Sequence, residues 1–428
     1  MKTKSLCLIW LVLFTTSAYS YQWGKLSFSL QERYRIVMWD NTVSLDEGAA
    51  DVSAFTRHRT NLCFGYQPMQ NIEIALQFTN EFRKYISPKN RAFTIHEWVI
   101  DQLYVKMNKP GNLPFNVTLG RQNIILGEGF VVIEGNPLDG SRTIYFNAAR
   151  FDIIPNDQHQ LTLAIVYNQA IDSLLPIIMD QDQALSDQDE TGAIAYYQGK
   201  FNGQTAEAYY IMKQNKEMNS RPEQTLHTIG ARGLFNLLDK KLSAQGEFAL
   251  QFGKQAETDR SGWGGNFYVK YTLPSKELTF LDYFKLGSVM LSGDDADTGD
   301  KIEGWDPLFA RFPKWSESYI YTQIKECGVA NWTNFQSFYA HLSLRFSNDI
   351  TWLWGYQLLG AFEKMPVIAG FNGSGTKRGT LIQTNLEYKM NQYLSMHAIW
   401  EHFNPDDYYF AEANAATWIR FQLLLNLK

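Results

Sequence analysis

The chain has 428 residues, of which 45% are hydrophobic, 15% aromatic and 19% charged, and its formal net charge is −5. This composition excludes a disordered or low-complexity protein, which would be poor in aromatic residues and rich in charge. The weakly acidic balance also excludes a global basic field for binding nucleic acid. An excess of aromatic residues, with 28 Phe, 23 Tyr and 12 Trp, remains to be explained.

Residues 1–20 have the pattern of a secretory signal peptide, with cleavage expected after Ser20. Lys2 and Lys4 precede an apolar run from Leu6 to Phe14. This run is too short for a transmembrane helix, since a helix needs roughly 20 apolar residues to cross a bilayer. We therefore expect residues 1–20 to be removed and residues 21–428 to form the exported protein.

Beyond the signal, apolar and polar residues alternate with a period of two, which is typical of strands with two different faces. The pattern is clear in segments 72–79, 242–252 and 338–346, and it returns at the end of the chain in segment 417–427. Repeated along the chain, it predicts about 18 strands, within a range of 16–18.

The connections between these strands alternate between short and long. The short connections cover residues 67–71, 108–113, 155–158, 201–204, 236–241, 274–281, 348–349 and 390–392. The long connections include residues 38–55, 123–145, 171–190, 294–334 and 404–414. A meander with short turns at one end and long loops at the other is typical of an outer-membrane barrel, which has short periplasmic turns.

These patterns predict an all-β protein in which residues 21–428 form a single antiparallel transmembrane β-barrel. The last strand should close against the first, around Leu26, Phe28 and Leu30. A soluble pair of β-sandwiches or a propeller is the alternative, but it would need a break between domains or a fixed blade repeat. Neither is visible in the sequence.

A barrel also explains the aromatic residues, because rings with a polar tip prefer the membrane interface and form a girdle at each rim. Aromatic residues at or near predicted strand ends are Tyr66, Phe82, Tyr104, Tyr167, Tyr271, Trp352, Trp354, Tyr388 and Trp400.

If the apolar face of each strand contacts lipid, the residues that alternate with it face the lumen. This lumen face contains more bases than acids. The bases are Arg33, Arg35, Arg57, Arg59, Arg83, Arg345, Lys389 and Arg420, and the acids are Glu73, Glu81, Glu247 and Glu387. Rings of Arg or Lys admit anions, because the guanidinium group is permanently charged and binds carboxylates in a bidentate manner. Cross-strand pairing of Arg with Glu to rigidify the wall is the structural alternative.

Several short segments, taken in their order along the chain, resemble the alginate-export family of outer-membrane porins. They are Phe78 to Arg83, Gly120-Arg121-Gln122, Gly127-Glu128-Gly129, Gly140-Ser141-Arg142, Asn147-Ala148-Ala149-Arg150, Arg311 to Trp315 and Glu401-His402-Phe403.

The resemblance implies an 18-stranded barrel with an electropositive constriction that conducts a polyuronate or another anion. By motif position it implies lumen roles for Arg121, Arg142, Arg150 and Arg232. The alternation places Arg121 on the apolar face after Val117 and Leu119, so that a bulge would be needed to turn it inward.

Other kinds of site have less support. The acidic loop Asp294, Asp295, Asp297 and Asp300 is dense in carboxylates but lacks the Gly and Glu of a helix-loop-helix calcium motif, which leaves a loose Ca²⁺ site or a solvated loop. No Gly-x-Ser-x-Gly or His-Glu-x-x-His motif is present. We therefore expect no enzyme activity and no cofactor.

The sequence thus predicts a porin in the outer membrane of a Gram-negative bacterium. Its expected partners are outer-membrane lipid and an anionic oligosaccharide, polysaccharide or small organic anion, with no nucleic acid. We expect a monomer and leave a periplasmic partner open. An outer-membrane barrel enzyme and a soluble periplasmic carbohydrate-binding protein are the alternative functions.

Overall fold

The structure is a computed structural model. It describes residues 21–49, 52–89, 98–134, 145–176, 178, 186–273, 280–311, 314–318, 332–365, 370–371 and 373–427. The expected signal peptide and Arg142 lie outside the described residues.

The described residues form 22 strands and two 3-10 helices. The first half contains β1 (Tyr21–Trp23), β2 (Leu26–Asp40), η1 (Glu47–Ala49), β3 (Ser53–Met69), β4 (Ile72–Ser87), β5 (Trp98–Asn108), η2 (Pro110–Asn112), β6 (Phe115–Gln122), β7 (Ile124–Ile125), β8 (Ile133–Glu134), β9 (Phe146–Asn156), β10 (His159–Asn168) and β11 (Glu190–Phe201). The second half contains β12 (Gln204–Asn215), β13 (Gln224–Leu237), β14 (Leu242–Gln255), β15 (Thr258–Thr272), β16 (Leu281–Leu291), β17 (Lys301–Ile302), β18 (Phe335–Arg345), β19 (Ile350–Gly360), β20 (Lys377–Lys389), β21 (Leu394–Pro405) and β22 (Ala416–Leu427). Neither of the two short helices in this described part is long and apolar enough to cross a membrane.

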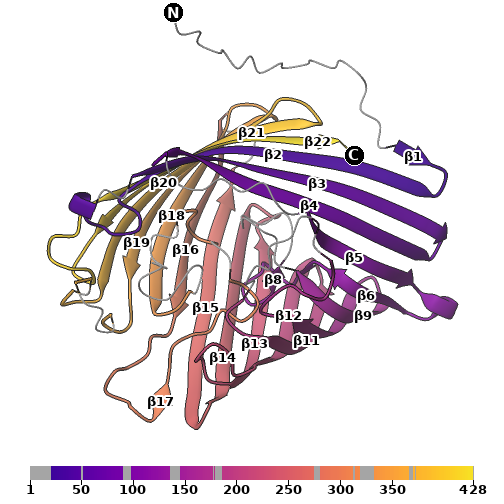
Figure 1. Ribbon diagram of the computed structural model, residues 1–428, viewed down its shortest axis with the longest axis horizontal. Helices are drawn as coiled ribbons and strands as arrows, with labels where there is room; N and C mark the ends of the chain where they lie inside the picture. Colours follow the sequence, from indigo (N-terminus) through magenta and orange to yellow (C-terminus); the bar gives the residue numbers. More distant parts are fainter. Residues whose placement is uncertain are drawn as a thin grey trace, which may run out of the picture.

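Eighteen of the strands form a closed antiparallel barrel, which confirms the predicted fold class. Closure is made by β22 against β2, with a register that runs from Leu30 opposite Leu427 to Asp40 opposite Thr417 (Figure 1). Each of the other neighbouring barrel strands is also paired antiparallel to the next, so no long edge is left open to pair with another chain.

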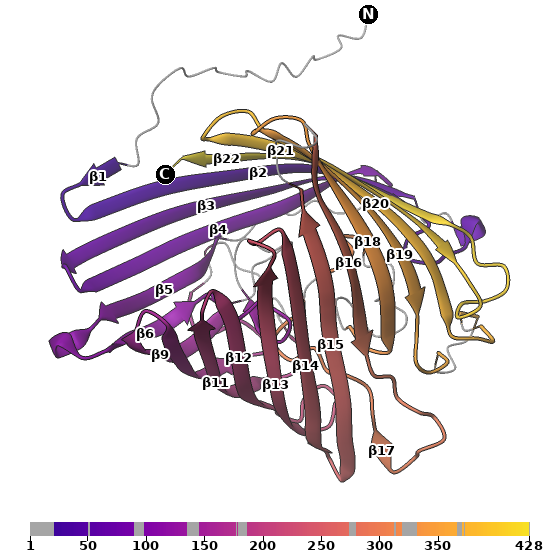
Figure 2. The same ribbon diagram turned by 180° about the vertical axis from the view of Figure 1, so that it is seen from behind.

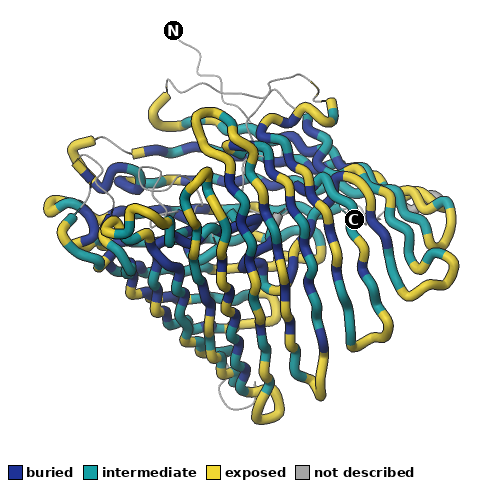
Figure 3. Tube along the Cα trace, turned by 90° about the horizontal axis from the view of Figure 1, so that it is seen from below, coloured by how far each residue is buried: buried dark blue, intermediate teal, exposed yellow. Residues whose placement is uncertain are grey.

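The burial of side chains alternates along the barrel strands, as the sequence pattern predicts (Figure 3). In β14, Phe248, Leu250 and Phe252 are 43%, 46% and 48% exposed, whereas Glu247 and Gln251 on the other face are 2% and 4% exposed. An exposed apolar face is stable in this fold because hydrocarbon chains of the membrane cover it.

The connections follow the predicted alternation with one exception. On the side of the long loops, β14 and β15 are joined only by Ala256 and Glu257. Ala256 adopts a positive φ of 49°, as a tight hairpin turn requires. The short strand β17 of the following long loop pairs in parallel with β15 beside this hairpin (Figure 2).

The apolar core lies inside the barrel, where two long loops fold inward and pack together. These inner loops are residues 123–134 and 303–311. Their backbones join where the Ile133 amide donates to the Phe309 carbonyl over 3.0 Å and the Phe309 amide donates to the Val131 carbonyl over 3.2 Å. Val131 and Leu308 are fully buried. The inner loops therefore fill part of the lumen and narrow it.

Candidate functional site

Four neighbouring strands bring six predicted arginines to one inner wall of the barrel. The register places Arg33 opposite Arg59 and Arg35 opposite Arg57 between β2 and β3. The same alternation continues into β4 on one side and β22 on the other. We call this set the arginine wall; its members are Arg33, Arg35, Arg57, Arg59, Arg83 and Arg420.

A single carboxylate ties the centre of the arginine wall together. Glu81 lies 2.5 Å from Nε of Arg57, 3.1 Å from Nε of Arg59 and 3.2 Å from Nη2 of Arg33. All four side chains are buried, so these bonds act at low dielectric and hold the guanidinium groups in fixed orientations. Glu81 is therefore a structural counter-ion for three positive charges.

A second carboxylate reaches the arginine wall from the segment that follows the second inner loop. Glu317 Oε2 lies 2.7 Å from Arg420 Nη1, and Arg420 Nε also donates to Nε2 of His397 over 3.0 Å. Burial alone would raise the pKa of the Glu317 carboxyl, but the charges of Arg420 and Arg35 outweigh this and hold its pKa below the ordinary value. Glu317 is therefore ionised and occupies the end of the arginine wall.

Arg83 sits in a different environment from the other arginines of the wall. Its guanidinium carbon lies 4.3 Å from the centre of the Phe55 ring, and its Nη1 donates to the Tyr85 hydroxyl over 3.2 Å. A cation over an aromatic face keeps its full charge, because the ring quadrupole does not neutralise it.

Residues 314–318, which we call the inner strap, are anchored to the wall formed by β19, β20 and β21. Glu401 accepts hydrogen bonds from the amides of Glu317 and Ser318, each at 3.0 Å, and from the Ser316 hydroxyl at 2.7 Å. The side-chain amides of Gln357 and Gln383 both donate to the Trp315 carbonyl. These bonds place Glu317 in front of Arg420.

The far end of the inner strap meets an acidic cluster. The Lys314 ammonium donates to the Glu128 carbonyl oxygen. Arg232 is surrounded there by the carboxylates of Glu128, Glu207 and Glu247 at 3.1, 2.9 and 4.0 Å. Arg232 thus lines the lumen but is paired with several acids, so its charge is largely balanced.

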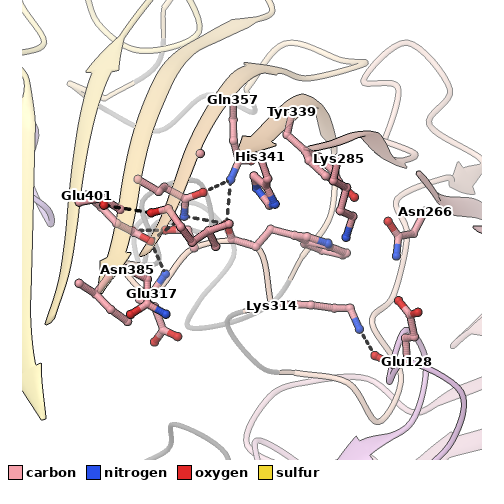
Figure 4. Close-up of a pocket in the computed structure, with 17 residues that line it drawn as sticks. Glu128, Asn266, Lys285, Lys314, Glu317, Tyr339, His341, Gln357, Asn385 and Glu401 are labelled. Carbon is pink, nitrogen blue, oxygen red and sulfur yellow. Dashed lines mark hydrogen bonds between the residues drawn. The ribbon is translucent and has the colours of Figure 1, made fainter. Parts of the chain in front are cut away.

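A cavity of about 270 Å³ lies between the inner strap and the barrel wall formed by β15 to β21 (Figure 4). Its charged lining consists of two cations, Lys285 and Lys314, and three carboxylates, Glu128, Glu317 and Glu401. Four side-chain amides, among them those of Asn266 and Asn385, and the aromatic side chains of Trp315 and Tyr339 complete it. Burial lowers the pKa of the Lys314 ammonium to about 8, although the charges of Glu247 and Glu128 act in the opposite direction.

Arg121 does not line the lumen. Arg121 lies on the same face of the sheet as its cross-strand neighbours Leu103 and Asn147. Ala148 lies on the opposite face and packs against the interior core. No bulge turns it inward. Instead, Arg121 makes a bidentate ion pair of 2.8 and 3.3 Å with Asp172 and so ties the loop after β10 to the barrel.

Two more predicted arginines are paired with acids on their own parts of the wall. Arg150 Nη2 lies 2.9 Å from Asp152 on β9. Arg345, at the end of β18 next to a short turn, lies 3.0 Å from Asp282 and is 54% exposed. Neither contacts the arginine wall, so the structure brings six of the eleven predicted arginines together.

Two carboxylates of the acidic loop accept hydrogen bonds from backbone amides. Asp294 accepts from the Glu303 amide over 2.7 Å, and Asp295 accepts from the Asp297 amide over 2.9 Å. Within the described ranges, no group of three or more His, Cys, Asp or Glu side chains is placed to hold a metal ion.

Sequence reasoning assigned no role to Lys285, Lys314, Glu317 and Glu401, although Lys314 and Glu401 stand in two of the segments that resemble the family. The alternation could have found Lys285, because it lies between Phe284 and Leu286, which are 42% and 51% exposed on the lipid face. For Lys314 and Glu401 the family-like segments were the available signal. Glu317 stands in a long loop without periodicity, and the role of Glu401 follows from the strap residues that it binds.

The sequence model described as alginate export matches residues 25–359. No curated protein matches the chain. Solved structures with a similar fold include Pseudomonas aeruginosa OccK2 (OpdF) in complex with glucuronate and a BenF-like porin from Pseudomonas fluorescens Pf-5. Each has a TM-score of 0.59 at 11% identity, with 94% of this chain and 98% of the other covered. Pseudomonas aeruginosa OccK11 (OpdR) has a TM-score of 0.56 at 11% identity, with 94% of this chain and 95% of the other covered.

Proposed function

The chain belongs to the alginate-export family and is an outer-membrane channel of a Gram-negative bacterium, and we propose that this channel conducts an anionic solute along the arginine wall. The solute class we propose is a polyuronate, or a smaller carboxylate of the same chemistry. The family and the porins of similar fold are transport proteins rather than enzymes.

The arginine wall is the observation that carries this proposal. Six guanidinium groups share one face of four adjacent strands, and Glu81 and Glu317 are among the carboxylates paired with them. A row of guanidinium groups attracts carboxylates and binds them through two parallel hydrogen bonds. Neighbouring guanidinium groups offer several similar positions, so a carboxylate can move from one to the next.

Several weak sites in a row suit conduction better than one tight site, because a solute must be able to leave each site. The complex of OccK2 with glucuronate, a uronate, supports the same solute chemistry for a channel of similar fold. The inner strap stands against the arginine wall through Glu317, and in our proposal it acts as the gate that a solute displaces.

The test is to measure ion selectivity in planar bilayers with the purified full-length barrel. The wild-type channel should prefer anions. The triple variant Arg57→Gln, Arg59→Gln and Arg83→Gln should lower this preference several-fold, because three of the six charges of the wall are lost.

A matched control removes three exposed charges elsewhere, in Arg221→Gln, Lys240→Gln and Lys254→Gln. This variant should keep the wild-type preference. A cation-selective wild-type channel, or an equal loss of preference in both triple variants, would refute the role of the arginine wall.

A further inference from the structure

We propose that Glu128 is a positioning residue for the gate of the channel. Its side chain docks the tip of the inner loop 123–134 on the barrel wall, and its backbone carbonyl holds one end of the inner strap. We call Gly127, Glu128 and Gly129 the loop tip. This inference rests on the proposed function, in which the inner strap is the gate. It predicts that the strap opens when the loop tip leaves the wall.

The Glu128 carboxylate contacts side chains from two strands of the wall. Its Oε1 lies 3.1 Å from Nη2 of Arg232 on β13 and accepts a hydrogen bond of 2.8 Å from the Tyr268 hydroxyl on β15. Burial alone would raise the pKa of the Glu128 carboxyl, but the Tyr268 hydrogen bond and the charges of Arg232 and Lys314 outweigh it and hold this pKa below the ordinary value. Glu128 is therefore ionised at neutral pH, and its hydrogen bonds to the wall are charge-assisted.

The two glycines of the loop tip let its backbone lie very close to its neighbours. Gly127 has a positive φ of 56°, and a Cβ atom there would lie 2.5 Å from the Tyr196 hydroxyl and 3.1 Å from Glu207 Oε2. Gly129 has a positive φ of 71°, and a Cβ atom there would lie 2.7 Å from the Ile133 side chain. Glycine is the residue that adopts this backbone conformation in so little space. The loop tip therefore fits its docked position closely.

The loop tip can leave this position without stranding a buried charge. Arg232 retains the carboxylate of Glu207 at 2.9 Å and that of Glu247 at 4.0 Å when Glu128 is released. The side chain of Glu207 is 1% exposed, whereas that of Glu128 is 35% exposed and remains within reach of water. Breaking a buried ion pair is costly because it leaves an uncompensated charge, and no such charge arises here. Glu128 is thus the exchangeable partner of Arg232.

The base of the same loop is held more firmly. Phe130 stacks on Trp305 with 5.3 Å between the ring centres, and Val131 and Val132 are fully buried. The backbone of this part is also hydrogen-bonded to Phe309 of the second inner loop. Release of the loop tip therefore leaves the apolar core intact, and the opening is confined to a short segment of low local stability.

The loop tip also holds the inner strap. The Lys314 ammonium at one end of the strap donates to the backbone carbonyl of Glu128, and Glu401 binds the strap backbone at the other end (Figure 4). The carboxylates of Glu247 and Glu128 both attract this ammonium. When the loop tip leaves the wall, the Lys314 end of the strap is released and the Glu401 end stays attached. A strap fixed at one end can move aside, whereas a strap fixed at both ends cannot.

The experiment records single-channel currents of the purified full-length barrel in planar bilayers and measures the fraction of time at the higher conductance level. Glu128→Ala should raise this fraction about fivefold, less than the loss of a fully buried charged contact would, because the carboxylate is partly exposed. Glu128→Gln, which keeps an acceptor for Tyr268, should lie between the wild type and Glu128→Ala. Gly127→Ala keeps the carboxylate but fills the docked position, and it should act like Glu128→Ala.

Two matched controls change the same residue types in the long loop before the strap. Glu303→Gln removes a carboxylate that accepts from the Thr298 hydroxyl of the same loop. Gly299→Ala adds a methyl group where the described residues, its chain neighbours aside, place no atom within 4 Å. Both controls should keep the wild-type fraction. Each variant is first checked for heat-modifiable migration on a gel, which reports an intact barrel.

A double variant tests the link between the loop tip and the strap. Lys314→Met should also raise the fraction, because it removes the bond of the strap to Glu128. If the two residues act in series, Glu128→Ala combined with Lys314→Met should show the effect of the stronger single variant. Independent contacts would instead multiply their effects, and that result would overturn the positioning role of Glu128.

Ion selectivity, measured on the same channels, separates this inference from the proposed function. An anion-selective wild type whose Glu128→Ala and Gly127→Ala variants keep the wild-type traces would overturn the positioning role and leave the proposed function standing. A cation-selective wild type whose variants still open more would refute the role of the arginine wall and leave Glu128 as the positioning residue of the gate.

Discussion

Replacing Glu317 by Gln should increase the anion preference of the channel. Glu317 Oε2 lies 2.7 Å from Arg420 Nη1, where a permeating carboxylate would have to bind. Gln has the same shape and keeps an acceptor for Arg420 but carries no charge. The backbone bonds of Glu401 to the inner strap do not depend on the Glu317 side chain, so the strap should stay in place.

The size of the effect follows from the repulsion between two carboxylates that would share Arg420. Two unit charges about 4 Å apart interact by about 1 kcal/mol in bulk water and about 4 kcal/mol at an effective dielectric constant of about 20. The lower figure alone corresponds to roughly a fivefold change in occupancy, since about 1.4 kcal/mol is a factor of ten. We therefore expect the anion-to-cation permeability ratio to rise by about fivefold.

The assay is the reversal potential across a salt gradient in planar bilayers. It should be run near 0.1 M and near 1 M salt, because the Debye length falls from about 10 Å to about 3 Å and the effect should shrink with it. Glu257→Gln, which removes an exposed charge from the turn between β14 and β15, is the control and should change the ratio little. If Glu317→Gln raises the conductance but leaves the ratio unchanged at both salt concentrations, the counter-ion role of Glu317 is refuted.

Two further predictions concern the inner strap and the inner loops. Burial lowers the pKa of Lys314 to about 8, so its ammonium is charged at pH 7 and mostly neutral at pH 9. The anion preference of the channel should therefore fall over this range. Lys314→Met should remove most of this pH dependence, and an unchanged dependence in that variant would contradict the prediction. Phe309, 1% exposed, packs edge-on against Phe146 at 5.6 Å. Phe309→Ala should cost about 3–5 kcal/mol of packing between the inner loops. The barrel should stay intact and heat-modifiable on a gel, but its conductance should be larger and noisier. A current trace like that of the wild type would argue against loop packing as the constriction.

The sequence alone was sufficient for the barrel because the two faces of a strand differ locally. Alternation with a period of two identifies the lipid face at every strand, and it placed Arg33, Arg57 and Arg59 on the inner face without any knowledge of their neighbours. The same rule placed Arg121 on the other face, against its position in the family motif, and the structure agrees with the rule.

Only the tertiary structure decided which acids these arginines meet. Glu81 could be recognised as an acid of the inner face, but its contact with three arginines depends on the register of three strands. Glu317 and Lys314 come from a long loop whose sequence has no period, because it folds against the barrel wall and the other inner loop rather than along a regular surface. Strand faces follow from the order of neighbouring residues, whereas the pairing of charges across a lumen depends on where distant segments meet.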